Sequence, residues 1–237
     1  VPFMATLYVG MAVIVLVSHY DQIGAAFEQI FIGAFTGAGV AGGFIGALIQ
    51  GLKRATFSNE AGVGSAAIAH SAVKTKEPIT EGFVSLLEPF IDTVVICTMT
   101  ALVIIISGMN TGALSGVTLT AAAFTETSFI FEYFLALAVV MFAFSTMVSW
   151  SYYGLKAWTY LFGEGATTEL VYKGIFCLFV IVGTSISFGA VIDFSDAAMF
   201  SMSIFNIIGL YYLMPIVKKE LNSFVARVNS GEIKRYK

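Results

Sequence analysis

A polar, glycine-rich stretch at residues 51–73 interrupts one of the long apolar segments of this chain. It places a lysine, an arginine, an asparagine and a glutamate in apolar surroundings. Two glycines and two serines at its centre make a continuous helix unfavourable. In a bilayer, irregular backbone is tolerated only where it is buried in protein or lines a water-filled cavity. We therefore predict a single membrane crossing made of two short helical pieces, with a break over residues 57–62.

The chain as a whole has the composition of a membrane protein. Hydrophobic residues make up 58% of its 237 residues and charged residues 11%, whereas about a quarter of the residues in a soluble domain are charged. The mean hydropathy is +0.88. Most of the chain must therefore contact lipid or other protein. Both cysteines, Cys97 and Cys177, lie in apolar runs and are predicted to be inert thiols.

Apolar segments long enough to cross a bilayer predict an all-α polytopic membrane protein with about six transmembrane helices, the second of them broken. The predicted spans are residues 3–20, 39–73, 81–108, 129–153, 170–189 and 197–217. Residues 21–35 are predicted to form an interfacial helix, and residues 117–124 a short helix within the linker 109–128. Residues 1–217 form one predicted transmembrane domain, and residues 218–237 a polar, basic tail.

The placement of lysine and arginine predicts which side of the membrane each loop faces. All but two of the 12 lie between spans two and three, between span four and the first residues of span five, or in the tail. By the positive-inside rule these regions, and with them the C-terminus, are cytoplasmic, and we expect the plasma membrane of a bacterium. The asymmetry requires residues 39–73 to cross once. An alternative ends this span at Lys53 and lays residues 57–73 along the cytoplasmic surface.

A broken helix exposes backbone groups of opposite polarity. It leaves unpaired N–H groups at the start of its second half and unpaired carbonyls at the end of its first half. The N–H groups of Ala61, Gly62 and Val63 would favour a carboxylate, and the carbonyls of Phe57 and Ser58 a cation or an ammonium group. A zwitterionic amino acid needs both. Alternatively, the glycines only allow close helix packing.

Glu60 is the sharpest single candidate, because a carboxylate in a membrane is costly and usually functional. It anchors the break to neighbouring helices, contacts the substrate or its cation, or forms a salt bridge with Lys53 or Arg54. We favour the structural role, and we predict that the Asn59 side chain satisfies a backbone group. Lys53 and Arg54 lie one to two turns outward, where a gate or a snorkelling role stays open.

Other polar residues in the predicted spans carry weaker signals. Asp92 follows Glu88 by one helical turn, and two such carboxylates repel unless one is protonated or a cation lies nearby; otherwise Glu88 is interfacial and Asp92 caps a neighbour. Asn206 is typical of a residue that joins helices. His19 and His70 have no accompanying carboxylate and nucleophile, and no metal-ligand spacing occurs.

Ser145 and Thr146 lie in the fourth predicted span, somewhat past its middle. Hydroxyl oxygens suit a hard cation such as Na⁺. Such side chains in membrane helices also bond back to the carbonyl four residues earlier, and the pattern alone favours that second interpretation.

These motifs resemble the alanine or glycine:cation symporter family. The matching runs are residues 51–66 (GLKRATFSNEAGVGSA), 74–78, 90–98, 144–154 and 205–209. The resemblance implies a fold similar to the bacterial leucine transporter, with two inverted five-helix repeats whose first helices are broken. The first predicted span would then end the first repeat, and spans two to six would form the whole second repeat.

The resemblance also implies positions for the ligands. The implied substrate-site residues are Phe57, Ser58, Asn59 and Gly62, and we include the intervening Glu60 and Ala61. The implied sodium ligands are Ser58, Ser145 and Thr146. Lys53, Arg54 and Asp92 are retained as gate or structural polar residues.

The predicted function is sodium-coupled uptake of a small neutral amino acid, alanine or glycine, with Na⁺ as coupling ion and no other cofactor. Lipid and the missing N-terminal half of the transporter are the expected partners, and nucleic acid is not. The chain begins at Val1 without an initiator methionine or signal peptide, and the first repeat is absent. We therefore expect a fragment that does not transport alone. The alternatives are a passive channel and a membrane-embedded enzyme using Glu60 or Asp92.

Overall fold

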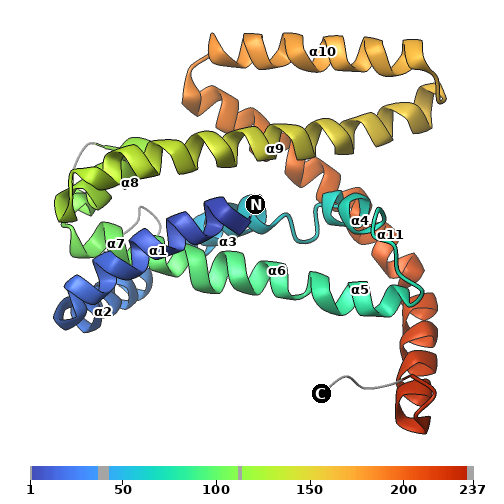
Figure 1. Ribbon diagram of the computed structural model, residues 1–237, viewed down its shortest axis with the longest axis horizontal. Helices are drawn as coiled ribbons and strands as arrows, with labels where there is room; N and C mark the ends of the chain where they lie inside the picture. The colour runs from blue at the N-terminus through green and yellow to red at the C-terminus, as the bar shows by residue number, and fades with distance from the viewer. Residues whose placement is uncertain (1, 37–42, 112–113, 234–237) are drawn as a thin grey trace. The chain divides into compact units, whose positions relative to one another are not determined.

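The computed structural model describes residues 2–36, 43–111 and 114–233, and the regular structure in these ranges is helical (Figure 1). The helices are α1 (Pro2–Ser18), α2 (Ile23–Phe35), α3 (Gly43–Asn59), α4 (Ser65–His70), α5 (Pro78–Ser85), α6 (Leu87–Pro89), α7 (Thr98–Ile106), α8 (Gly116–Thr127), α9 (Ile130–Phe162), α10 (Ala166–Thr184) and α11 (Phe188–Ser230). A π-helical stretch, Phe90–Cys97, joins α6 to α7, and 3-10 turns occupy Tyr20–Gln22 and Met109–Thr111. The predicted all-α class is confirmed, as are helices over residues 21–35 and 117–124.

Four helical stretches among the described residues are long and apolar enough to cross a membrane. They are Pro78–Ile106, Ile130–Phe162, Ala166–Thr184 and Phe188–Ser230. Helix α1 and the segment Tyr20–Phe35 meet at a bend of 80° and would add a fifth span if the pair crosses as one. The predicted count of six stays a prediction, as does the crossing of residues 39–73, part of which lies outside the described residues.

The chain divides into two compact units. The first contains Val1–Arg54 and Ile91–Tyr152. Its core is made by α1, α7, α8 and the start of α9, and the buried residues are Met11, Ala12, Val15, Val103, Ala123, Phe124, Phe131 and Leu135. Beside this core the Tyr8 hydroxyl lies 2.5 Å from the Thr100 hydroxyl, and the Tyr8 ring packs on Phe124. Burial of these apolar side chains is the term that holds the unit together.

The second unit contains Ala55–Phe90 and Tyr153–Lys237. Helix α10 folds back along the end of α9, where the Trp158 indole N–H donates to the Thr168 carbonyl at 3.1 Å and the Trp158 and Tyr172 rings are 5.9 Å apart. Helix α5 contacts both α4 and α11. The polar segment 60–64 therefore belongs to a unit with few buried side chains and several long-range polar contacts.

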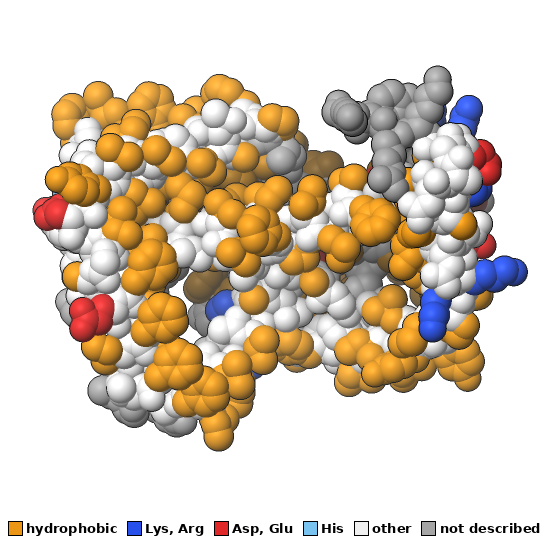
Figure 2. Space-filling view, turned by 90° about the horizontal axis from the view of Figure 1, so that it is seen from below, with side chains coloured by type: hydrophobic (Ala, Val, Ile, Leu, Met, Phe, Trp, Pro, Cys, Tyr) orange, Lys and Arg blue, Asp and Glu red, His pale blue; other side chains and the backbone are white. Residues whose placement is uncertain are grey.

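Long helix surfaces in this chain are apolar and exposed. Phe179 and Ile181 on α10 have exposed fractions of 66% and 65%, and Phe205 on α11 has 75%. Figure 2 shows hydrophobic side chains spread over the face of the molecule seen there. Exposed apolar surface on this scale is suited to lipid or to further protein rather than to water.

Helix α11 is longer than the sequence pattern predicted. It begins at Phe188 rather than at residue 197, and it continues past Pro215 to Ser230 through the segment predicted as a polar tail. No glycine lies between Lys218 and Ser230, so nothing there favours an early end of the helix. Gly231 ends it with φ 82°, the left-handed conformation typical of a residue that follows a helix.

Candidate functional site

The chain leaves the helical conformation between α3 and α4. Helix α3 ends at Asn59 and α4 begins at Ser65. Between them φ is positive at Glu60 (54°), Gly62 (82°) and Gly64 (107°). We call residues 60–64 the interhelical turn. Three left-handed residues in five reverse the chain too sharply for either helix to continue through it.

The interhelical turn lies later in the sequence than the predicted break. The prediction covered residues 57–62, but Phe57 and Ser58 are in the last turn of α3. They remain helical because the backbone leaves the right-handed region only at Glu60. The start of the second helical piece was also placed too early, at Ala61 to Val63, whereas α4 starts at Ser65 and has only six residues.

Side chains in the interhelical turn and directly beside it satisfy its polar groups. The Asn59 side-chain oxygen accepts a hydrogen bond from the Ala61 N–H at 2.9 Å, so the backbone-satisfying role predicted for Asn59 is confirmed. The Glu60 carboxylate accepts from the Ser65 hydroxyl at 2.5 Å, and Ser65 is fully buried. These contacts support the structural interpretation of Glu60, which closes the turn onto the first residue of α4.

Helix α11 contacts the interhelical turn through one amide side chain. The Asn206 Nδ2 donates to the Gly62 carbonyl at 3.0 Å. A Cβ atom built at Gly64 would lie 3.3 Å from both Cγ and Oδ1 of Asn206. An asparagine in an apolar helix indicated an interhelical bond, but the sequence held no signal for its partner 144 residues away. Asn206 joins the candidate site because it holds a carbonyl of the turn.

The backbone of the interhelical turn is partly open. Ala61 and Gly62 are exposed, and so are Phe57 and Ser58 at the end of α3. Val63 is buried, with an exposed fraction of 1%. Of the substrate residues implied by the resemblance, Phe57, Ser58, Ala61 and Gly62 are therefore exposed, and Asn59 and Glu60 are half-buried.

The remaining candidates lie in the first unit and are described separately. Ser145 is half-buried and Thr146 exposed, both on α9, whereas Ser58 belongs to the second unit. Lys53 is half-buried and Arg54 exposed on α3, and half-buried Asp92 accepts from the Thr93 hydroxyl at 3.3 Å. The sodium-ligand and gate assignments stay predictions.

Two carboxylates of the third predicted span have partners that sequence reasoning missed. Glu81 and Glu88 both contact His70, at 2.6 and 3.1 Å. His70 therefore has two carboxylate partners, and no nucleophile accompanies them in these contacts. The residues are 11 and 18 positions apart, so no local pattern could indicate the cluster. Glu88 is exposed, and its interfacial interpretation stays a prediction.

An ion pair connects the start of α5 to the end of α11. The Arg227 guanidinium donates to both oxygens of the Glu77 carboxylate, at 2.7 and 2.6 Å. The rings of Phe83 and Phe224 lie 6.3 Å apart on the same two helices. Beside them lies a groove of about 350 Å³, whose lining includes Pro78 and Ile216. Helix α5 and the polar end of α11 are thus joined by both charge and apolar contact.

We expect Arg227→Gln to weaken this junction at neutral pH and to leave it unchanged in acid. Hydrogen bonds from Arg227 lower the pKa of the Glu77 carboxyl from its ordinary value of 4.5. Because the folded-state pKa is the lower one, the pair stabilises above pH 4.5 and loses this effect as the pH falls through the lowered pKa. Thermal unfolding of the intact protein measured against pH and salt tests this.

The control for Arg227→Gln is Lys173→Gln. Lys173 makes a single, exposed bond to Glu169 within α10, at 3.2 Å, and such surface pairs contribute little. If Arg227→Gln lowers the stability at neutral pH by no more than Lys173→Gln does, the proposed role of the bidentate pair is wrong.

Comparison with known proteins assigns the chain to a family. All 237 residues match the sodium:alanine symporter family. The chain is 38% identical over 229 residues to the sodium/alanine symporter AgcS of Methanococcus maripaludis (94% of this chain, 50% of that protein). It is 32% identical over 234 residues to the probable sodium/glutamine symporter GlnT of Bacillus subtilis (97% and 48%). The chain spans about half the length of these curated relatives. It belongs to the sodium:alanine symporter family.

Proposed function

We propose that the chain is half of a secondary transporter that couples the inward movement of Na⁺ to the uptake of a small neutral amino acid, alanine or glycine. Its family consists of symporters, so it is not an enzyme, and the alternative in which Glu60 or Asp92 acts as an acid or base is discarded. The named relatives include a sodium/alanine and a probable sodium/glutamine symporter. Our choice of a small substrate rests on the resemblance of residues 51–66.

The observation that carries this proposal is the interhelical turn. Ala61 and Gly62 are exposed residues, while Asn59 binds the Ala61 N–H, Glu60 binds the Ser65 hydroxyl and Asn206 binds the Gly62 carbonyl. A backbone segment held in this way is rigid without being helical, as a binding site requires. Substrate would bind along residues 57–62, with the Gly62 N–H facing its carboxylate and the α3 carbonyls facing its ammonium group, since the Ala61 and Val63 N–H groups already donate to Asn59 and Glu60.

The second part of the proposal is the sodium site that the resemblance implies. Sodium would bind Ser58 together with Ser145 and Thr146 and so complete the site for the amino acid. Residues 39–73 would cross the membrane once as the broken first helix of a second inverted repeat. The other half of the transporter would supply the remaining ligands, and the polar end of α11 would face the cytoplasm.

We expect Ser58→Ala and Thr146→Ala each to raise the sodium concentration needed for half-maximal alanine uptake by about tenfold. Loss of one sodium ligand that contributes about 1.4 kcal/mol of binding free energy gives that factor. The measurement is alanine uptake by the intact protein in proteoliposomes under an imposed sodium gradient. Uptake should saturate and should depend on the gradient, which distinguishes a symporter from a passive channel.

The matched control is Ser201→Ala. The Ser201 hydroxyl donates to the Ala197 carbonyl of its own helix at 2.8 Å, so its removal should leave the sodium dependence unchanged. An unaltered sodium requirement in both Ser58→Ala and Thr146→Ala would overturn the sodium assignment. Uptake that persists without any gradient would overturn coupled transport.

A further inference from the structure

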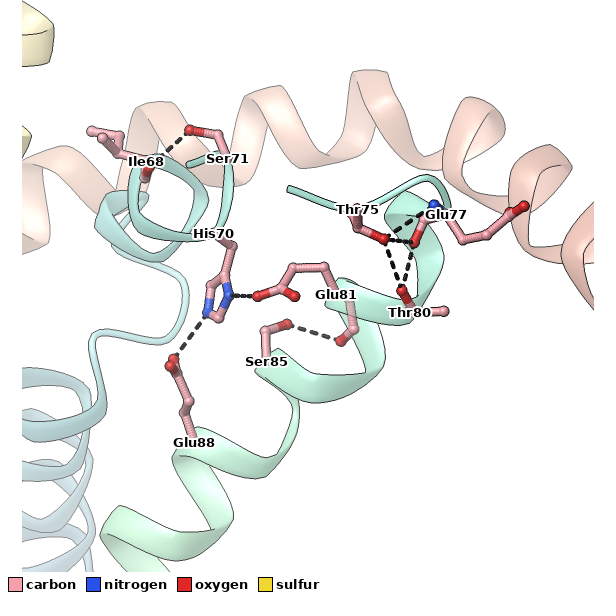
Figure 3. A network of polar contacts seen from close by, with 10 residues as sticks. Ile68, His70, Ser71, Thr75, Glu77, Thr80, Glu81, Ser85 and Glu88 are labelled. Atoms are coloured by element: carbon pink, nitrogen blue, oxygen red, sulfur yellow. Dashed lines mark hydrogen bonds and ion pairs between the residues drawn. The ribbon is translucent and has the colours of Figure 1, made fainter. Parts of the chain in front are cut away.

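The imidazole ring of His70 lies between two carboxylates. Figure 3 shows the ring at the end of α4 with one nitrogen directed at Glu81 of α5 and the other at Glu88 of α6. The Nδ1–Glu81 Oε1 distance is 2.6 Å and the Nε2–Glu88 Oε2 distance is 3.1 Å. The side chains of His70 and Glu81 are each 18% exposed, and that of Glu88 is 56% exposed. We call these three residues the histidine clasp.

The two contacts of the histidine clasp require an additional proton. A neutral imidazole has one N–H, whereas an ionised carboxylate can only accept hydrogen bonds. Two bonds from one ring to two carboxylates therefore need either an imidazolium or a protonated carboxylic acid. In both cases the cluster carries one proton more, and one negative charge less, than a neutral histidine beside two ionised glutamates.

The extra proton allows His70 to bind both carboxylates, and so it joins α4 to α5 and α6. Removing it leaves a neutral ring that can bond to only one carboxylate, so the other contact is lost. Among the described residues, the charged groups that face His70 are Glu81 from α5 and Glu88 from α6. The nearby Glu77 carboxylate is bound by Arg227. Because Arg227 is engaged with Glu77, it does not replace the missing proton at His70.

The connection between α4 and α5 is otherwise organised by its own hydrogen bonds. The Ser71 hydroxyl donates to the Ile68 carbonyl at 2.8 Å, at the end of α4. The Thr80 hydroxyl donates to the Glu77 carbonyl at 2.7 Å, and the Glu77 N–H donates to the Thr75 hydroxyl at 3.1 Å. Figure 3 shows these bonds at the two ends of the loop, away from the imidazole. Among the described residues, the side-chain hydrogen bonds between α4 and the α5–α6 segment are those of the histidine clasp.

We propose that His70, Glu81 and Glu88 form a proton-binding site, and that the bound proton holds α4 against α5 and α6. Helix α4 begins at Ser65, whose hydroxyl binds Glu60, so the clasp lies one short helix away from the interhelical turn. The proton therefore regulates the segment that we propose to bind substrate, and this regulatory part rests on the proposed function.

The first experiment measures the proton directly and does not depend on transport. The intact protein is labelled with ¹³C at histidine Cε1 and titrated by NMR, with the His70 signal identified by its loss in His70→Gln. His19 is the internal reference, since its Nδ1 lies 3.0 Å from the Val15 carbonyl and contacts no carboxylate in the described structure. We expect the His70 signal to report loss of the additional proton of the clasp at a higher pH than for a histidine without a carboxylate partner.

Neutralising either carboxylate tests whether Glu81 and Glu88, rather than the general surroundings of His70, hold the proton. Glu81→Gln should move the His70 titration midpoint toward acid by about one pH unit, a tenfold loss of proton affinity, while His19 stays unchanged. Glu88→Gln should also move the His70 titration midpoint toward acid. If wild-type His70 titrates like a histidine without a carboxylate partner, and Glu81→Gln does not move its midpoint, there is no proton site, whatever the protein transports.

The second experiment measures the regulatory consequence. Alanine uptake at saturating sodium is followed against pH, where the wild type should show a step at the pH at which NMR shows His70 losing its proton. The step should disappear in His70→Gln and remain in His19→Gln. A step that persists in His70→Gln, with the NMR result upheld, would overturn the regulation but keep the site. Absence of all sodium-driven uptake would overturn the proposed function instead.

Discussion

Gly64→Ala should abolish alanine uptake and lower the stability of the intact protein by about 2–5 kcal/mol, of which the left-handed conformation accounts for about 1–2 and overpacking for about 1–3. Gly64 has φ +107°, and a Cβ there would lie 3.3 Å from the side chain of Asn206. The alanine would therefore strain the interhelical turn and push away the amide that binds the Gly62 carbonyl. Thermal unfolding and uptake by purified protein in proteoliposomes are the measurements.

Two other glycines divide this effect into its causes. Gly62 also has a positive φ, +82°, but nothing lies within 4 Å of a Cβ built there, so Gly62→Ala should show the strain alone. Gly51 is helical with open space around it, and Gly51→Ala should raise stability by up to about 1 kcal/mol. In an Asn206→Ala background the side chain that the new Cβ would approach is gone, so Gly64→Ala should lower the stability less than it does in the wild type. Equal costs for Gly64→Ala and Gly62→Ala would show that Asn206 does not constrain the turn.

Glu60→Ala should cost about 1.5–3 kcal/mol, the range for a hydrogen bond to a charged group, because it leaves the Ser65 hydroxyl without its acceptor. Ser65 is fully buried, and its bond to the Glu60 carboxylate is 2.5 Å long. Ser65→Ala should be comparably destabilising. The double variant should be little worse than either single variant, because both remove the same bond. Chemical or thermal unfolding of the four proteins measures this coupling.

The matched control at the same position is Glu60→Gly. Glu60 has φ 54°, so glycine removes the carboxylate and relieves the backbone, and it should be milder than alanine by about 1 kcal/mol. Additive effects of Glu60→Ala and Ser65→Ala would contradict the structural role. They would return Glu60 to the interpretations in which it contacts the cation or pairs with Lys53 or Arg54.

Much of the helical architecture could be predicted from local pattern. The helices α2 and α8 and the apolar spans within α9, α10 and α11 follow from apolar length and periodicity, which act over a few turns. The limits of the elements were less accurate. Helix α11 extends nine residues further toward the N-terminus than the predicted span, and the interhelical turn begins three residues later than the predicted break. Both errors have the same cause. A serine or another polar residue makes a helix less favourable by only a fraction of a kcal/mol, so packing can extend a helix through such residues.

The candidate site was predicted in part. Asn59 and Glu60 were identified as polar groups serving the turn, because an unpaired backbone group or a carboxylate in apolar surroundings must be satisfied nearby. The same reasoning flagged Asn206 but could not name its partner, Gly62. It missed the contact of His70 with its two glutamates.

The sequence by itself determined that this chain is helical and apolar, that it belongs to a symporter family, and that one segment near Asn59 cannot remain a helix. These properties depend on hydrophobicity and on backbone preferences, which each short stretch carries within itself. Only the tertiary structure decided which polar groups meet: Asn206 with the turn, Arg227 with Glu77, and His70 with two carboxylates. A hydrogen bond depends on distance and direction between atoms far apart in the chain, and these are set by how the helices pack.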